Sequence, residues 1–261
     1  MKPTQSGAHQ FACCVAAKGD NHESVEWQSS RSHWGVKRNW RRDRKGFSSA
    51  RSFRSCELFD QQRRRHKVVA EIGKAGGKAI AVGGSVAKPE DIDRIFAETK
   101  KAYGRVDILV NNAGVYAFSP IETLTTESIN ALFSVNVFGL LLATKAALPL
   151  FTEEGGSIIN IGSVIGEMAP AQASIYAGTK GALNSISRVF AKELAPKKIR
   201  VNAVNPGAVH TEGFESAGFK DSPMEAHMDQ NTPLGRLGMP RTSRTWLRIL
   251  HRRSLVGLLA H

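Results

Sequence analysis

Three side chains in the middle of the sequence, Ser163, Tyr176 and Lys180, could together move a proton. Tyr176 and Lys180 are four residues apart on a predicted helix and therefore share one face of it. A tyrosine hydroxyl has a pKa of about 10, which a neighbouring ammonium group lowers by stabilising the phenolate. A serine hydroxyl beside that phenol could hold a carbonyl or alcohol oxygen. The trio predicts general acid–base catalysis, although a tyrosine and a lysine at this spacing also occur on ordinary surface helices.

Proton transfer to a carbonyl oxygen is productive only when a hydride reaches the carbonyl carbon. Side chains of the standard amino acids do not supply hydride, whereas a nicotinamide cofactor does. The trio therefore also predicts a nicotinamide-binding fold around it.

The segments around these residues alternate between strands and helices. Short apolar runs predict strands at 78–82, 106–110, 157–161 and 199–204, and helical patterns follow Pro89 and cover about 129–150 and 174–194. Each strand is a continuous apolar run, which indicates a parallel sheet covered on both faces. Ligands in such sheets bind beyond the carboxyl ends of the strands. Those ends are followed by clusters of Gly, Asn, Ser and Pro, which alone would be ordinary turns.

Several motifs occur together in one order and at consistent separations. They are NNAG at 111–114, Asn136 in SVNVFG, Ser163 thirteen residues before YAGTK at 176–180, and NPG at 205–207. In this combination the chain resembles the short-chain dehydrogenase/reductase family over about residues 66–240. The resemblance implies a Rossmann-like, doubly wound α/β fold and NAD(P)-dependent transfer of a hydride between nicotinamide and a carbonyl or alcohol, with reduction as the expected direction.

The resemblance also implies roles for individual residues. Tyr176 would be the acid/base, Lys180 would lower its pKa and hold the nicotinamide ribose, Ser163 would orient the substrate oxygen, and Asn136 would hold a water that relays protons to the lysine. Further cofactor-lining positions are Asn112, Ala113 and Gly114 on the adenosine side and Pro206 and Gly207 near the nicotinamide. The stretch 211–233 would be a mobile substrate lid, and with 167–172 would choose the substrate.

Two positions depart from the family pattern. Ser85 stands where the family usually carries an acid that contacts adenine, which puts adenine affinity in question. Residues 1–67 contain no T-G-x-x-x-G-x-G, the loop whose glycines let the backbone approach the cofactor pyrophosphate. We therefore expect the chain as written to lack the first, second and last strands of the family's sheet and to bind NADP(H) poorly.

The stretch SHWGVKRNWRRDRKG at 32–46 acquires the missing motif when every codon is read one base further on. Tryptophan has the single codon TGG, so the shift turns both Trp34 and Trp40 into glycine. Arg38 permits a third glycine, and the whole stretch permits T-G-A-S-x-G-I-G. Under the opposite shift, 241–260 permits the family's last helix. We interpret residues about 22–65 and 241–261 as frameshifted translations.

The restored second strand would end N-Y-S-T-S-K, without the acid that binds the ribose of NAD, which favours NADP. The chain then divides into an aberrant basic segment at 1–65, a dehydrogenase core at 66–240 and an aberrant segment at 241–261.

The charge distribution leaves one alternative open. The formal net charge of +13 is carried by residues 1–67 at +9 and 241–261 at +5, whereas 68–240 is near neutral at −1. A basic arm with tryptophans on a degenerate, non-catalytic Rossmann domain could bind nucleic acid or acidic partners. We favour the enzyme, because the arm leaves the codon pattern unexplained.

The expected partners are a small carbonyl or alcohol substrate and further copies of the chain, paired through the helices at about 121–150 and 174–195, as the family resemblance implies. Nucleic acid, membrane and metal are not expected: no apolar run reaches the length of a span, and Cys13 and Cys14 lack metal-ligand spacing. The expected location is cytoplasmic. The similarity extends loosely to 3-oxoacyl reductase-like and sugar dehydrogenase-like members.

Overall fold

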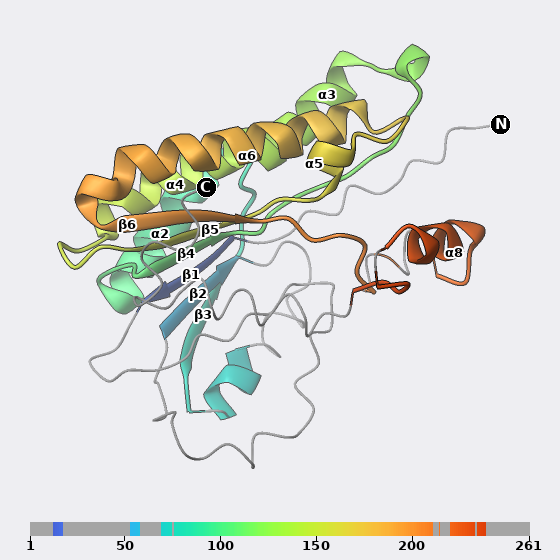
Figure 1. Ribbon diagram of the computed structural model, residues 1–261. Coiled ribbons are helices and arrows are strands. Elements are labelled where there is room, and N and C mark those ends of the chain that lie inside the picture. Colours follow the sequence, from blue (N-terminus) through green and yellow to red (C-terminus); the bar gives the residue numbers. More distant parts are fainter. Residues whose placement is uncertain are drawn as a thin grey trace.

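The computed structural model of the chain describes residues 13–17, 53–57, 69–74, 76–210, 214, 220–232 and 234–238. Six strands form one sheet in the order β3-β2-β1-β4-β5-β6. Their bounds are β1 Cys13–Ala17, β2 Phe53–Glu57, β3 Lys78–Val82, β4 Ile108–Asn111, β5 Gly156–Ile161 and β6 Ile199–Val204. Figure 1 shows α4 and α6 along one face of this sheet. The predicted Rossmann-like α/β fold is confirmed.

Helices follow the strands where the sequence predicts them. Their bounds are α2 Pro89–Tyr103, α3 Thr126–Phe133, α4 Gly139–Ala147, α5 Ile165–Met168, α6 Ser174–Leu194 and α8 Pro223–Gln230, with short 3-10 turns η1 Ile121–Thr123, η3 Leu148–Leu150 and η4 Ala195–Lys197. The first turn of α2 contains Pro89 and two acids, and Gly104 ends the helix at φ 74°. Proline suits the first turn of a helix because the amide that it lacks would have no partner there, and acids suit it because they face the positive end of the helix dipole. Glycine suits the end because it adopts a positive φ without strain.

The long helical run between β4 and β5 is interrupted at its centre. Residues Ser134–Phe138 form a π-helical turn, η2, between α3 and α4. By length and composition the run Thr126–Leu150 could cross a membrane, because an 18-residue window within it has a mean hydropathy of 1.7, although Ser134, Asn136, Thr144 and Lys145 interrupt its apolar residues. Half of that window is buried inside the domain, where α4 packs against β4 and α2. A core helix meets the same criterion.

The N-terminal segment supplies two strands that we did not predict. β1 lies in the centre of the sheet, between β2 and β4, and is antiparallel to both. The expectation that the chain lacks its first two strands is therefore wrong, although the remaining neighbouring pairs are parallel, as predicted. The written phosphate-loop stretch 32–46 and the segment 241–261 lie outside the described residues.

The core lies between the sheet and the helices α2, α4 and α6. Val106, Leu109 and Ile158 are completely buried, and Ile95 of α2 and Ala147 of α4 pack into the same cluster. Burial of such side chains contributes roughly 1.5–3 kcal/mol each for the larger ones. This packing holds the strand ends, and the loops that follow them, in fixed relation to one another.

Candidate active site

The carboxyl ends of β4, β5 and β6 meet at one edge of the sheet. Asn111 pairs with Asn160, and Ile161 pairs with Val204, so the loops that begin at 112, 162 and 205 emerge side by side. The second and third loops are joined by backbone hydrogen bonds. The Gly162 N–H donates to the Val204 carbonyl at 2.7 Å, and the Val164 N–H donates to the Pro206 carbonyl at 3.1 Å. The motifs of the sequence therefore converge on this edge.

Ser163 and Tyr176 meet at this edge, one from the loop after β5 and the other from the first turn of α6. Ser163 is buried, and its hydroxyl accepts a hydrogen bond from the Ile165 N–H at 3.2 Å. Burial raises the pKa of Tyr176 above its ordinary value, the Ser163 hydrogen bond lowers it, and the nearby Tyr116 raises it. The net direction is upward. Desolvation of the phenolate outweighs the other effects. The lowering of this pKa by Lys180 stays a prediction.

Lys180 lies one turn further along α6 and is fully buried. Its Nζ donates a hydrogen bond to the Ile161 carbonyl at 2.8 Å and lies 5.8 Å from the centre of the Tyr176 ring. Burial lowers the pKa of Lys180 to about 8, because a buried ammonium loses its hydration. The lysine therefore sits between the end of β5 and the phenol, with a proton that is exchangeable near neutral pH.

Asn136 is buried in the π-helical turn η2, and its side chain is fully engaged. The amide oxygen accepts from the Val115 N–H at 2.8 Å, and the amide nitrogen donates to the Val115 carbonyl at 2.8 Å and to the Thr179 hydroxyl at 3.0 Å. The side chain thus fixes the loop after β4 to α6. The relay water that the family resemblance implies at Asn136 stays a prediction.

The remaining sequence-predicted residues line the same edge. A Cβ added at Gly114 would lie 3.5 Å from Asn136 Oδ1 and 3.6 Å from Lys180 Nζ, whereas one added at Gly207 would meet nothing within 4 Å. Asn112, Ala113 and Pro206 are partly exposed. A phenol, a buried ammonium and the partly exposed loops at 112–114 and 206–207 therefore share one edge of the sheet, and hydroxyl, ammonium and backbone groups are suited to hydrogen-bond a ribose and a nicotinamide amide.

The pyrophosphate half of the cofactor would need a glycine-rich loop after a central strand. In this chain Cys13, the first residue of β1, pairs with Asn111 at the carboxyl edge, and Ala16 pairs with Ile108 at the other end of β4. β1 therefore begins at the catalytic edge, whereas a first strand parallel to β4 would end there. β1 itself ends towards the opposite edge.

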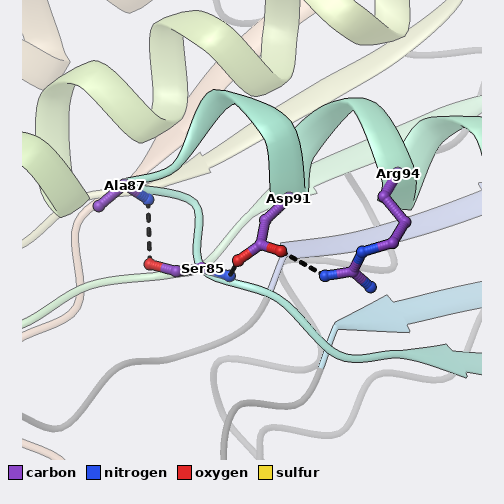
Figure 2. A network of polar contacts seen from close by, with 4 residues as sticks. All are labelled: Ser85, Ala87, Asp91 and Arg94. Carbon is purple, nitrogen blue, oxygen red and sulfur yellow. Dashed lines mark hydrogen bonds and ion pairs between the residues drawn. The ribbon is translucent and has the colours of Figure 1, made fainter.

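A polar network surrounds Ser85 in the loop after β3 (Figure 2). The Asp91 carboxylate, at the start of α2, accepts a hydrogen bond from the Ser85 N–H at 2.8 Å and pairs with Arg94. The Ser85 hydroxyl accepts from the Ala87 N–H at 3.3 Å. The Ser85 amide and then Arg94 hold the pKa of Asp91 below its ordinary value. The acid next to this loop comes from α2 rather than from position 85.

Two aromatic residues at the site were missed from the sequence. Tyr116 and Phe118 follow the NNAG motif, and their ring centres lie 6.1 Å from that of Tyr176. The sequence feature that could have identified them is their position soon after the carboxyl end of a central strand, where ligands bind in such sheets.

Of the predicted lid at 211–233, the structure describes Phe214 and 220–232. Phe214 packs edge-on to His210, with 5.6 Å between ring centres. Within the described ranges no group of three His, Cys, Asp or Glu side chains could hold a metal ion.

Comparison with known proteins identifies the family. Residues 55–221 match the family model described as short chain dehydrogenase. An uncharacterized oxidoreductase of Methylorubrum extorquens is 51% identical over 173 residues, which cover 66% of this chain and 69% of that protein. Human 3-oxoacyl-[acyl-carrier-protein] reductase is 39% identical over 170 residues, covering 65% and 69% of the two chains.

Solved structures agree. A mutant short-chain dehydrogenase/reductase of Serratia marcescens matches with a TM-score of 0.71 at 29% identity, covering 76% of this chain and 79% of that one. A blue fluorescent protein from a metagenomic library, in complex with NADPH, matches with a TM-score of 0.70 at 26% identity, covering 76% and 79%. The chain, with its hydroxyl, phenol and buried ammonium at the carboxyl edge of the sheet, belongs to the short-chain dehydrogenase/reductase family of nicotinamide-dependent oxidoreductases.

Proposed function

We propose that the site reduces a carbonyl group with NADP(H), and that Tyr176 is the proton donor. The observation that carries this proposal is the convergence of Ser163, Tyr176 and the buried Lys180 at the carboxyl edge of the sheet, where the Lys180 Nζ lies 5.8 Å from the centre of the Tyr176 ring. A tyrosine phenol has an ordinary pKa of about 10 and is protonated at neutral pH, and burial raises the pKa of Tyr176 further in that direction. The protonated phenol is the state that a general acid needs. Reduction requires a proton donor, whereas alcohol oxidation requires a base.

Each residue of the site has one task in this reaction. The bound nicotinamide supplies the hydride that adds to the carbonyl carbon. The Ser163 hydroxyl donates a hydrogen bond to the carbonyl oxygen and holds it at the phenol. The Tyr176 proton passes to that oxygen as the hydride arrives, which leaves a phenolate and an alcohol. The Lys180 ammonium, with its pKa of about 8, stabilises the phenolate and stands in the path of its reprotonation.

Asn112, Ala113 and Gly114 would line the adenosine side of the cofactor, and Pro206 and Gly207 the nicotinamide side. NADP is preferred over NAD in this proposal, because the restored second strand lacks the acid that would bind the ribose of NAD. The NADPH complex of the related blue fluorescent protein supports the same choice. Four relatives named 3-oxoacyl-[acyl-carrier-protein] reductase, from human, mouse, rat and cattle, support an acyl or similar apolar carbonyl substrate.

We further propose that residues about 22–65 and 241–261 are frameshifted, and that the core is 66–240. The strand β1, Cys13–Ala17, lies before the proposed shifted segment and carries no argument for or against it. The family model nevertheless matches from residue 55, inside the proposed shifted segment. The coding DNA decides: third bases that do not spell T-G-A-S-x-G-I-G over residues 33–40 contradict the frameshift.

The proposed partners are a small-molecule substrate and other copies of the chain, and the proposed location is cytoplasmic, away from membranes and nucleic acid. The alternative basic arm concerns residues that lie mostly outside the described part, and no described contact favours it.

The function is tested by the fall of NADPH absorbance with a carbonyl substrate, using the chain as written and a frame-restored chain. We expect turnover in the restored chain, and Tyr176→Phe to lower it roughly 10²–10⁴-fold, the range for loss of a general acid. Tyr103→Phe, at the end of α2, is the matched control. For the chain as written we expect no NADPH-dependent rise in melting temperature. A restored chain in which Tyr176→Phe retains full activity contradicts the proposal.

A further inference from the structure

Two aromatic rings, those of Tyr116 and Phe118, lie beside the ring of the catalytic Tyr176. The ring centre of Tyr176 lies 6.1 Å from those of Tyr116 and Phe118, and the latter two lie 6.2 Å apart. The interplanar angles are 56°, 73° and 55°, so the rings are tilted or edge-on to one another. These are the separations and orientations that aromatic groups prefer.

The loop that carries Tyr116 and Phe118 is held at both ends. Val115, immediately before Tyr116, has both its N–H and its carbonyl bound by the Asn136 side chain at 2.8 Å. Ser119, immediately after Phe118, donates its N–H to the Gln172 carbonyl at 2.8 Å. The two rings are therefore positioned before a ligand arrives, and little ordering is needed on binding.

The rings remain partly open although they adjoin a buried phenol. Phe118 is 44% exposed, whereas most large apolar side chains of the core are below 9%. Tyr116 is half-buried, and burial raises the pKa of its phenol. Phe118 thus offers an accessible aromatic surface, and its ring centre lies 6.1 Å from that of the proton donor Tyr176.

A group attached to the reacting carbon would lie against these rings when its oxygen is held by Ser163 and Tyr176. An aromatic ring there can adopt edge-to-face contacts with Tyr116 and Phe118, which a saturated ring of similar size cannot. Such pairs strengthen binding by roughly 2- to 12-fold beyond the effect of buried area.

We propose that Tyr116 and Phe118 are specificity-determining residues, which select substrates with an aromatic ring on the reacting carbon over those with a saturated one. This inference rests on the proposed function for the identity of the reacting group. It differs from that proposal in what it predicts, since aromatic preference is a property of binding and is measurable without turnover.

The test is the affinity of the full chain for two matched alcohols, 1-phenylethanol and 1-cyclohexylethanol, measured by ligand-observed NMR titration. We expect the phenyl compound to bind about 2- to 12-fold more tightly. Phe118→Leu and Tyr116→Leu should each reduce that ratio, and the double variant should abolish it. Tyr116→Phe, which keeps the ring, should retain it, as should Ile121→Ala at an exposed position beyond the loop.

Equal binding of the two alcohols by the unmodified chain, binding of neither, or a preference that survives in the double variant overturns the inference. Melting temperatures identify any variant that fails to fold. If the double variant or Tyr116→Leu fails, the affinity ratio of the two alcohols is compared between Tyr116→Phe, which should retain it, and Phe118→Leu, which should reduce it. The outcomes separate the two proposals. Aromatic preference in a frame-restored chain that shows no NADPH-dependent reduction contradicts only the proposed function. Equal turnover of acetophenone and cyclohexyl methyl ketone by that chain contradicts only this inference.

Discussion

The Nζ of Lys180 donates a hydrogen bond to the Ile161 carbonyl at 2.8 Å, which ties the catalytic helix α6 to the last residue of β5. The ammonium is buried, and this carbonyl offsets only part of its lost hydration. The pKa of Lys180 is accordingly lowered from 10.5 to about 8. The buried position of the Lys180 ammonium, which the chemistry needs, therefore lowers the free energy of unfolding at neutral pH.

That cost predicts a pH dependence. Between about pH 8 and 10.5 the unfolded chain binds a proton on Lys180 that the folded chain has released, so the free energy of unfolding rises with pH in this window. A difference of about 2.5 pKa units corresponds to about 3 kcal/mol. Lys180→Met removes this dependence. We expect the variant's stability relative to the unmodified chain to fall by about 3 kcal/mol from pH 7 to pH 10.5, in urea unfolding followed by circular dichroism.

Lys192→Met, an exposed position on the same helix, is the control and should show no such trend. A difference between Lys180→Met and the unmodified chain that is flat across this pH range would contradict the assigned burial of the ammonium.

Asn136→Ala should destabilise the chain by about 2–4 kcal/mol, because it leaves the buried N–H and carbonyl of Val115 without their partner. Asn130→Ala, on the exposed side of the neighbouring helix α3, should change stability by less than about 0.5 kcal/mol. Chemical denaturation of both variants measures the difference. Similar small losses in both would mean that the Asn136 amide does not hold the loop after β4.

The strands and the longer helices between 78 and 204 could be predicted from the sequence because they have local signals. β3 and β6 have the predicted bounds, since their apolar runs are bordered by residues that end a strand. The helix α2 begins at Pro89, as expected. The convergence of Ser163, Tyr176 and Lys180 followed from motif spacing on a parallel sheet.

Other features had no local signal. The direction of β1 depends on which strands flank it, and its sequence CCVAA pairs equally well either way. The π-helical turn at Asn136 depends on contacts with Val115 and Thr179, which are distant in sequence. The upward pKa shift of Tyr176 depends on burial, whereas spacing indicated only the neighbouring lysine. Tertiary packing decided each of these.

Gly155 lies in the turn before β5, at a φ of 78°, where a Cβ would come within 2.1 Å of the Lys198 carbonyl oxygen. Gly155→Ala therefore combines left-handed strain with a clash against backbone, and we expect a loss of about 2–5 kcal/mol in the free energy of unfolding. Gly73→Ala, where a Cβ meets nothing within 4 Å, should leave stability unchanged or raise it by up to about 1 kcal/mol. Comparable effects of the two substitutions in denaturant titrations would contradict this account of the turn.

Phe138 and Val189 are large apolar residues exposed on the two helical regions through which we expect copies of the chain to pair. Phe138, at the end of η2, is 53% exposed, and Val189 of α6 is 50% exposed. Exposed apolar side chains on neighbouring helices favour association, because pairing removes them from water. We expect light scattering to report a dimer or tetramer, and Phe138→Asp with Val189→Asp to give monomers. Leu234→Asp, at a residue 78% exposed outside these helices, should leave the mass unchanged. A monomeric unmodified chain, or an oligomer that persists in the double variant, would show that these helices do not form the interface.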